Sequence, residues 1–245
     1  MSIAVQTVPT PEDLASTAAN IFASQIQDYP DSVLGLATGS TPVDTYARLA
    51  DLYENGLSFE HVTTFNLDEY VGLSQGDPQS YHSFMTTHLF DQVDLDPSRT
   101  HLPDGDSEDL DEACEEYERL LQDAGGIDLQ LLGIGSNGHI AFNEPGCADD
   151  SLTRVVDLAP ETVAANSRFF DSEDDVPGQA ITAGIATILS ADKILLLAYG
   201  ENKAEAVCQA LAGEITSDCP ASFLQKHPDC TFLLDAKAAE LLTEQ

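Results

Sequence analysis

Basic residues are scarce in this sequence. Lys and Arg together number 9 against 43 Asp and Glu, which leaves a formal net charge of −34. Binding to a nucleic acid or to an anionic membrane requires basic patches, so neither is expected as a partner. We interpret the acidity as an adaptation to a salt-rich cytosol, because the Debye length falls to about 3 Å in molar salt and self-repulsion is then screened. An acidic protein of an ordinary cytosol is the alternative.

Long apolar runs and paired cysteines are also missing. No run of apolar residues is long enough to span a bilayer, and no basic region precedes an apolar segment at the N-terminus. The 5 cysteines are scattered without a Cys-x-x-Cys pair, and the 6 histidines show no spacing typical of metal ligands. These absences predict a cytoplasmic protein without a signal peptide, a disulfide framework or a metal site.

Apolar and β-branched segments alternate with helical patterns along the chain. Hydrophobic residues make up 42% of the 245 residues, enough for one sizeable core, so we predict a single domain over residues 1–245. This alternation predicts an α/β fold with a three-layer, Rossmann-like, mostly parallel sheet and helices on both faces. The expected strands cover residues 32–37, 61–67, 128–135, 154–158, 193–200 and 230–235, and the expected helices cover residues 11–29, 42–56, 80–90, 108–123 and 201–213.

Four polar segments follow the expected strands at the point where each strand ends. They are Thr38–Thr41, Asp68–Tyr70, Ser136–His139 and Gly200–Lys203. Ligands of parallel α/β sheets bind beyond the carboxyl ends of the strands. We therefore expect these segments to meet at one edge of the sheet and to form the functional site.

The segment Thr38-Gly39-Ser40-Thr41 has the composition of an anion-binding loop. Its small side chains leave backbone N–H groups accessible, and Pro42 suits the first position of a helix whose N-terminus attracts negative charge. No Gly-Lys-Ser/Thr follows, so the loop is not of the kind that binds nucleoside triphosphates. A phosphate on a small metabolite fits the pattern, and an ordinary turn with a threonine cap is the alternative.

Two adjacent carboxylates, Asp68 and Glu69, stand at the end of an expected strand. Side chains alternate along a strand, so only one of them is expected to point into the site. A carboxylate in a partly apolar pocket can act as a general base. A solvated acidic turn is the alternative in a chain with this much acid.

The stretch GIGSNGHIAFNEPG, from Gly133 to Gly146, matches the spacing Gly-x-Gly-x-x-Gly of dinucleotide loops. Only the segment HIAFNE separates its third glycine from Pro145, which is too short for the helix that such a loop needs. We therefore favour a tight catalytic loop in which His139 stands at the strand end and Glu144 orients it as a proton shuttle. A histidine that only holds the turn is the alternative.

Arg168 and Lys203 are conspicuous because basic residues are so few. Lys203 lies at the start of an expected helix, where the helix dipole opposes a cation, and Arg168 lies among small and apolar residues. The net charge would repel a phosphate ligand, so a local pair of cations would be needed to hold it. Surface ion pairs are the alternative.

The motifs LATGSTP, TFNLDEYVGL, GHIAFNEPG, ANSRFF and SFLQKHP occur in this order along nearly the whole chain. In these motifs the chain resembles the glucosamine-6-phosphate deaminase family, and GHIAFNEP is quite specific. The related 6-phosphogluconolactonases share the fold, but their corresponding loop reads more like Gly-His-x-Ala-Ser-Leu-Phe-Pro. The resemblance implies an amino-sugar phosphate as substrate, fructose 6-phosphate and ammonia as products, and no metal or organic cofactor.

The resemblance also implies a role for each candidate residue. Asp68 takes the proton from C2 of the sugar and returns one at C1, through an enolamine. His139, oriented by Glu144, assists opening of the pyranose ring, and Tyr81 lines the pocket. The groups that hold the sugar phosphate are Thr38, Gly39, Ser40, Thr41, Arg168 and Lys203.

One position departs from part of the family. Some members have Asp where this chain has Asn137, and an Asn cannot stabilise an imidazolium by charge, so Glu144 would carry more of that task. Two other functions stay open, namely a lactonase or other sugar-phosphate enzyme on the same fold and a non-catalytic sugar-phosphate sensor. A homo-oligomer is compatible with the resemblance, because the family contains hexamers and smaller forms.

Overall fold

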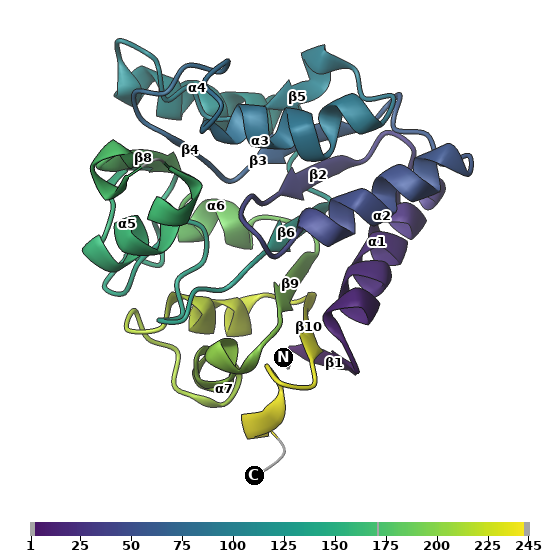
Figure 1. Ribbon diagram of the computed structural model, residues 1–245, viewed down its shortest axis with the longest axis vertical. Coiled ribbons are helices and arrows are strands. Elements are labelled where there is room, and N and C mark those ends of the chain that lie inside the picture. The colour runs from purple at the N-terminus through teal and green to yellow at the C-terminus, as the bar shows by residue number, and fades with distance from the viewer. Residues whose placement is uncertain (1–2, 171, 243–245) are drawn as a thin grey trace.

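The computed structural model describes residues 3–170 and 172–242. Its centre is a 7-stranded sheet in the order β1-β10-β9-β6-β2-β3-β5, in which neighbouring strands are parallel (Figure 1). The predicted α/β fold with a mostly parallel sheet is therefore confirmed. The strands span Ala4–Val8 (β1), Cys230–Asp235 (β10), Ile194–Ala198 (β9), Leu129–Leu132 (β6), Val33–Leu36 (β2), Thr63–Asn66 (β3) and Thr100–His101 (β5).

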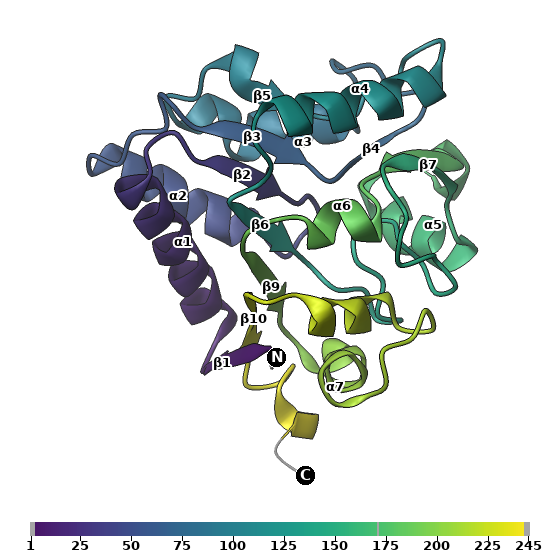
Figure 2. The ribbon, with the colours of Figure 1, turned by 180° about the vertical axis from the view of Figure 1, so that it is seen from behind.

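Helices surround this sheet on both faces. They span Pro11–Asp28 (α1), Val43–Glu54 (α2), Tyr81–His88 (α3), Leu110–Asp123 (α4), Pro160–Asn166 (α5), Ile185–Leu189 (α6) and Ala204–Ala212 (α7), with 3-10 turns at Phe90–Gln92 (η1), Pro97–Arg99 (η2), Ser167–Phe169 (η3), Glu173–Asp175 (η4), Glu201–Lys203 (η5), Pro220–Lys226 (η6) and Glu240–Leu242 (η7). α1 and α2 pack together on one face, and α6, α7 and η6 lie on the other (Figures 1 and 2). Among these described helices, none is both long and apolar enough to cross a membrane.

Burial explains the composition of the central strands. Every residue of β2 and of β9 is buried, and β9 reads Ile-Leu-Leu-Leu-Ala. Strands covered on both faces read as continuous apolar runs rather than as alternating patterns. This is why the sequence shows them clearly, and it leaves the loops at the strand ends as the places where polar side chains gather.

A second, antiparallel sheet in the order β4-β8-β7 was not predicted. Its strands are Asp68–Tyr70 (β4), Gln179–Thr182 (β8) and Arg154–Asp157 (β7). The expectation that residues 68–70 only follow the end of a strand is therefore wrong, because the chain leaves the parallel sheet at Leu67 and these residues pair at once with β8 as a strand of their own. A strand this short carries too little periodicity to be recognised in a sequence.

The starts of the first two helices differ in how well the sequence predicts them. The side chain of Thr10 caps α1 by accepting the N–H of Asp13 at 3.1 Å, and Pro11 occupies its first turn, as expected. α2 begins at Val43, with Pro42 as its N-cap and no side-chain cap bond. The expected first helical position for Pro42 is wrong by one residue, and the alternative of a threonine cap is not what the structure has.

Candidate active site

The four polar segments chosen from the sequence lie at one edge of the parallel sheet. They follow β2, β3, β6 and β9, and these strands are consecutive neighbours in the order β9-β6-β2-β3. Parallel strands end at the same edge, so this order brings the four segments side by side. The 3-10 turn η3 joins them from α5, because Arg168 in this turn reaches the segment after β2.

A pair of cations lies beside the loop after β2. A guanidinium nitrogen of Arg168 is 3.4 Å from Ser40 Oγ. Lys203 is the N-cap residue of α7, and burial followed by the nearby charge of Arg168 lowers its pKa. Two cations that interact in this way are both stabilised when an anion binds between them.

Ser40, which Arg168 contacts, belongs to the loop Thr38–Thr41. Gly39 has a φ of 88°, a left-handed conformation that favours glycine and lets the loop turn sharply. α2 starts directly after this loop, so the positive end of its dipole faces the loop. We call this loop together with Arg168 and Lys203 the anion corner.

Asp68 is a buried carboxyl group at the same edge. Only 6% of its surface is exposed. Burial, and then the charge of Glu69, raise its pKa from 3.8 to about 8. Its own charge contributes to the raised pKa values of Tyr70 and Tyr81, so these phenols lie near it. A carboxyl group that titrates near neutrality can both accept and return a proton.

Glu69 has a different, structural position. Its carboxylate accepts the backbone N–H groups of Tyr70, Tyr81 and His82 at 2.9, 2.8 and 2.9 Å. Burial raises its pKa, and these hydrogen bonds oppose the rise only in part. Glu69 therefore joins β4 to the first turn of α3, and the three N–H groups that it accepts are committed to it.

The loop after β6 holds His139 tightly over Gly135. A Cβ atom on Gly135 would lie 2.2 to 2.5 Å from atoms of the imidazole ring, so only glycine fits beneath it. Gly138 has a φ of 83°, and a Cβ atom there would lie 2.6 Å from Cys219 Sγ. Gly135 and Gly138, which match the spacing of a dinucleotide loop, thus form a turn around His139. The next helix begins only at Pro160.

Glu144 is held by side chains from three directions. Its Oε2 lies 3.5 Å from His139 Nδ1 and accepts a hydrogen bond from Asn137 Nδ2 at 2.8 Å. Its Oε1 accepts a hydrogen bond from Thr162 Oγ1 in α5. Burial raises the pKa of Glu144, but these three partners outweigh burial and bring the pKa from 4.5 to about 2. Glu144 is therefore ionised near neutral pH and can stabilise an imidazolium.

Asn137 supports the loop and the carboxylate rather than the imidazole. Its Oδ1 accepts the backbone N–H of His139 at 3.1 Å, while its Nδ2 is committed to Glu144. Asn137 thus donates a hydrogen bond to Glu144 that an ionised Asp could not donate, and Glu144 supplies the charge beside the imidazole nitrogen.

Tyr81 belongs to an aromatic cluster beside Asp68. Its ring lies parallel to that of Phe142, with centroids 6.2 Å apart, and its hydroxyl is 3.3 Å from the hydroxyl of Tyr70. Asn166 Nδ2 donates to the same Tyr70 hydroxyl at 2.9 Å. The cluster connects β4, α3, the His139 loop and α5. Sequence analysis did not single out Tyr70, Asn166 or Thr162, because their contacts depend on the unpredicted second sheet and on α5.

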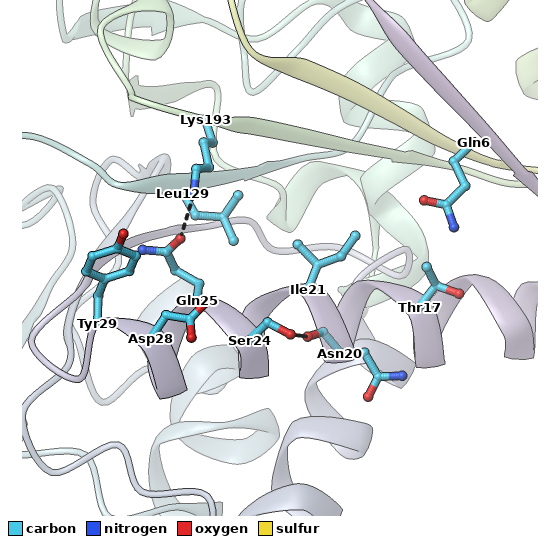
Figure 3. A pocket seen from close by; sticks show the side chains of 10 residues that line it. All are labelled: Gln6, Thr17, Asn20, Ile21, Ser24, Gln25, Asp28, Tyr29, Leu129 and Lys193. Atoms are coloured by element: carbon cyan, nitrogen blue, oxygen red, sulfur yellow. Dashed lines mark hydrogen bonds between the residues drawn. The ribbon is translucent and has the colours of Figure 1, made fainter.

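A separate cavity lies away from these residues. It has a volume of about 450 Å³ and runs between α1 and the sheet, with Gln6 at one end and Lys193 at the other (Figure 3). Lys193 Nζ donates to Gln25 Oε1 at 3.0 Å, so this lysine is engaged within the fold. None of the candidate site residues lines this cavity. Within residues 3–170 and 172–242, no group of three His, Cys, Asp or Glu side chains is arranged to hold a metal ion.

Comparison with known proteins identifies relatives over nearly the whole length. Residues 9–233 match the family described as glucosamine-6-phosphate isomerases/6-phosphogluconolactonase. A glucosamine-6-phosphate deaminase from Rhodopirellula baltica is 55% identical, over 99% of this chain and 97% of that protein. A protein of the same name from Halothermothrix orenii is 52% identical, over 94% of this chain and 96% of that protein.

Solved structures give the same picture of the fold. A structure described as a monomeric glucosamine-6-phosphate deaminase is 50% identical, with a TM-score of 0.96 over 98% of this chain and 100% of that chain. A 6-phosphogluconolactonase from Trypanosoma brucei, 24% identical with a TM-score of 0.80 over 98% of this chain and 99% of that chain, shares the fold. By sequence and by fold, this chain belongs to the glucosamine-6-phosphate isomerase and 6-phosphogluconolactonase family.

Proposed function

We propose that this chain is an isomerising deaminase that converts glucosamine 6-phosphate and water to fructose 6-phosphate and ammonia. Relatives with that name are 55% and 52% identical over nearly the whole chain, which supports the proposal. The observation that carries it is the placement of Asp68, a buried carboxyl group at the edge that holds the anion corner and His139, where burial raises its pKa. Moving a proton between adjacent carbons needs one base that can take a proton and return it.

Binding and ring opening use the anion corner and the His139 loop. The phosphate binds the backbone of Thr38–Thr41 and the cations of Arg168 and Lys203, which locally offset the negative charge of the chain. His139 carries a proton from the C1 hydroxyl to the ring oxygen, and the pyranose opens to the aldehyde. Glu144 stabilises the imidazolium that forms during this transfer. Tyr81 lines the pocket that holds the opened sugar.

The isomerisation uses Asp68 as the only base. Asp68 removes the proton from C2, the electron pair forms the C1–C2 double bond of an enolamine, and the carbonyl oxygen takes a proton from solvent, which returns to solvent when the protonated imine is hydrolysed. Asp68 then returns a proton to C1, which leaves a protonated imine at C2. Water adds to this imine and ammonia departs, so that the ketone of fructose 6-phosphate remains. The proton taken by Asp68 is given back, and the base is regenerated in each turnover.

Product analysis with two substrates tests this function. In molar potassium chloride the protein is expected to release ammonia and fructose 6-phosphate in equal amounts from glucosamine 6-phosphate. It is expected to leave 6-phosphogluconolactone to its spontaneous hydrolysis. Turnover of the lactone alone would replace the deaminase with a lactonase. Binding of glucosamine 6-phosphate without either reaction would indicate a sensor.

The setting of the enzyme is a further part of the proposal. We propose a cytoplasmic protein that works in high salt, which the net charge of −34 supports. We also propose that it is a hydrolase, because the proposed reaction consumes water. The solved relative is described as monomeric, which favours a small assembly over a hexamer for this chain. A single domain over residues 1–245 remains a prediction, and light scattering in molar salt would measure the assembly.

A further inference from the structure

The hydrogen bond from Thr162 to Glu144 joins α5 to the His139 loop. The segment of α5 and η3 has a part in the proposed phosphate binding, and the His139 loop has a part in the proposed ring opening. Thr162 lies in the first turn of α5 and is only 6% exposed. Its Oγ1 donates to Glu144 Oε1, on the side of the carboxylate away from His139. Its backbone N–H donates to the carbonyl oxygen of Ala159 at 2.9 Å, which fixes the residue at the start of the helix. The position of this hydroxyl therefore follows the position of α5.

The segment that carries Thr162 also carries the guanidinium of the anion corner. α5 ends at Asn166 and η3 follows at Ser167 without a break, so Arg168 lies less than two turns beyond Thr162. Asn166 binds the hydroxyl of Tyr70 and Arg168 binds Ser40. The short helical segment of α5 and η3 thus contacts Glu144 of the His139 loop, the aromatic cluster near Asp68 and the loop Thr38–Thr41.

The two oxygens of Glu144 are fixed by different elements. Asn137, within the His139 loop, holds Oε2, the oxygen that faces the imidazole. Thr162, from outside that loop, holds Oε1. With only the first bond, the carboxylate can rotate about its last side-chain bond, and the 3.5 Å contact with His139 Nδ1 is no longer enforced.

We propose that Thr162 is a positioning residue for Glu144 and His139. Through its hydrogen bond, the orientation of these two side chains depends on the position of the segment of α5 and η3, whose Arg168 binds the substrate phosphate. This inference rests on the proposed deaminase function and adds a residue to it. A phosphate that engages Arg168 holds the segment in place, and the same segment then holds Glu144 against the histidine. Ring opening is therefore fastest when the correct phosphorylated sugar is bound.

Substitution of Thr162 by valine tests the role of the hydroxyl with little change of shape. We expect Thr162→Val to lower kcat for ammonia release roughly tenfold to a hundredfold, since the lost hydrogen bond is to a charged group, and to leave KM nearly unchanged. Thr162→Ser keeps the donor and should restore most of kcat. The matched control is Thr153→Val, since Thr153 is 7% exposed and its hydroxyl donates to a carboxylate, Glu118, at 2.6 Å. That control is expected to reduce stability without reducing kcat.

A double-mutant cycle distinguishes positioning from a general structural effect. If Thr162 acts through Glu144, Thr162→Val has no further effect on kcat in a Glu144→Gln background, whereas independent losses would multiply. The comparison of valine with serine does not depend on residual activity of the Glu144→Gln variant. A wild-type kcat for Thr162→Val, equal losses for valine and serine, or multiplying losses would overturn the inference and leave the deaminase intact. A wild type that releases no ammonia would overturn both.

Discussion

Replacing Asp68 by Asn is expected to stabilise the fold in alkaline solution, even though it removes the proposed base. Burial and the charge of Glu69 raise the pKa of Asp68 from 3.8 to about 8. In the unfolded chain this carboxyl group ionises near pH 4, as exposed Asp side chains do. The free energy of unfolding of the wild type therefore falls as the pH rises from about 4 to about 8. In this window the unfolded chain loses the proton of Asp68, whereas the folded state must keep it or bury a charge. The Asn variant keeps its stability over this window.

The size of the effect follows from the shift in pKa. A rise of about four units, at about 1.4 kcal/mol for each unit, sets an upper limit of about 6 kcal/mol above pH 8. Water reaches a site that is open to a substrate, and the ionised group recovers part of its solvation there. We expect the variant to gain about 1–3 kcal/mol in the free energy of unfolding, the range found for uncompensated burial of a polar group.

Urea denaturation in molar potassium chloride measures this gain. Wild type and Asp68→Asn are compared at about pH 5 and about pH 9, and the difference in their free energies of unfolding should grow with pH. Asp31→Asn, at an exposed position, serves as the control and should show the same difference at both pH values. A variant whose advantage does not grow between the two pH values would show that ionisation of Asp68 does not strain the fold.

Three further sets of substitutions separate binding, structure and catalysis. Arg168→Ala and Lys203→Ala should each raise KM for glucosamine 6-phosphate roughly tenfold to a hundredfold, since each removes a charge-assisted contact with the phosphate. Steady-state kinetics measures this, and an unchanged KM in both would contradict the anion corner. Glu69→Ala should lower the free energy of unfolding by about 2–4 kcal/mol, because three backbone N–H groups lose their side-chain acceptor. Denaturation curves measure it, and wild-type stability would exclude the structural role. Gly135→Ala places a methyl group 2.2 to 2.5 Å from the ring of His139, so kcat should fall about a hundredfold while the circular dichroism spectrum is retained. Full activity would mean that the ring need not lie over this glycine.

The gathering of the four polar segments at one edge of the sheet could be predicted because it depends on features that are local in the sequence. Each polar segment begins where a buried apolar strand ends, and the parallel-sheet rule then assigns these segments to one edge. The choice of a catalytic loop over a dinucleotide loop at His139 also followed from local spacing. In the structure Gly135 and Gly138 form a turn and the next helix starts at Pro160, so the helix that a dinucleotide loop needs does not follow Gly138, while the catalytic role of the loop stays a prediction.

The contacts that assign roles could not be predicted from local patterns. Local reasoning could not say which of Asp68 and Glu69 is the base, because the answer depends on backbone donors at the start of α3. The pairing of Asp68 with Thr182 joins residues far apart in the chain and leaves no periodic signal. The contact of Thr162 with Glu144 is of the same kind, since it requires α5 to fold back over the His139 loop.

The most direct test of the central claim is the release of ammonia and fructose 6-phosphate from glucosamine 6-phosphate by the wild type and Asp68→Asn, side by side in molar potassium chloride. We expect equal amounts of both products from the wild type. We expect a loss of roughly a hundredfold to ten-thousandfold in kcat for the variant, the usual contribution of a general base. A folded wild type that releases no ammonia would contradict the deaminase function. A variant that turns over at the wild-type rate would contradict the role of Asp68.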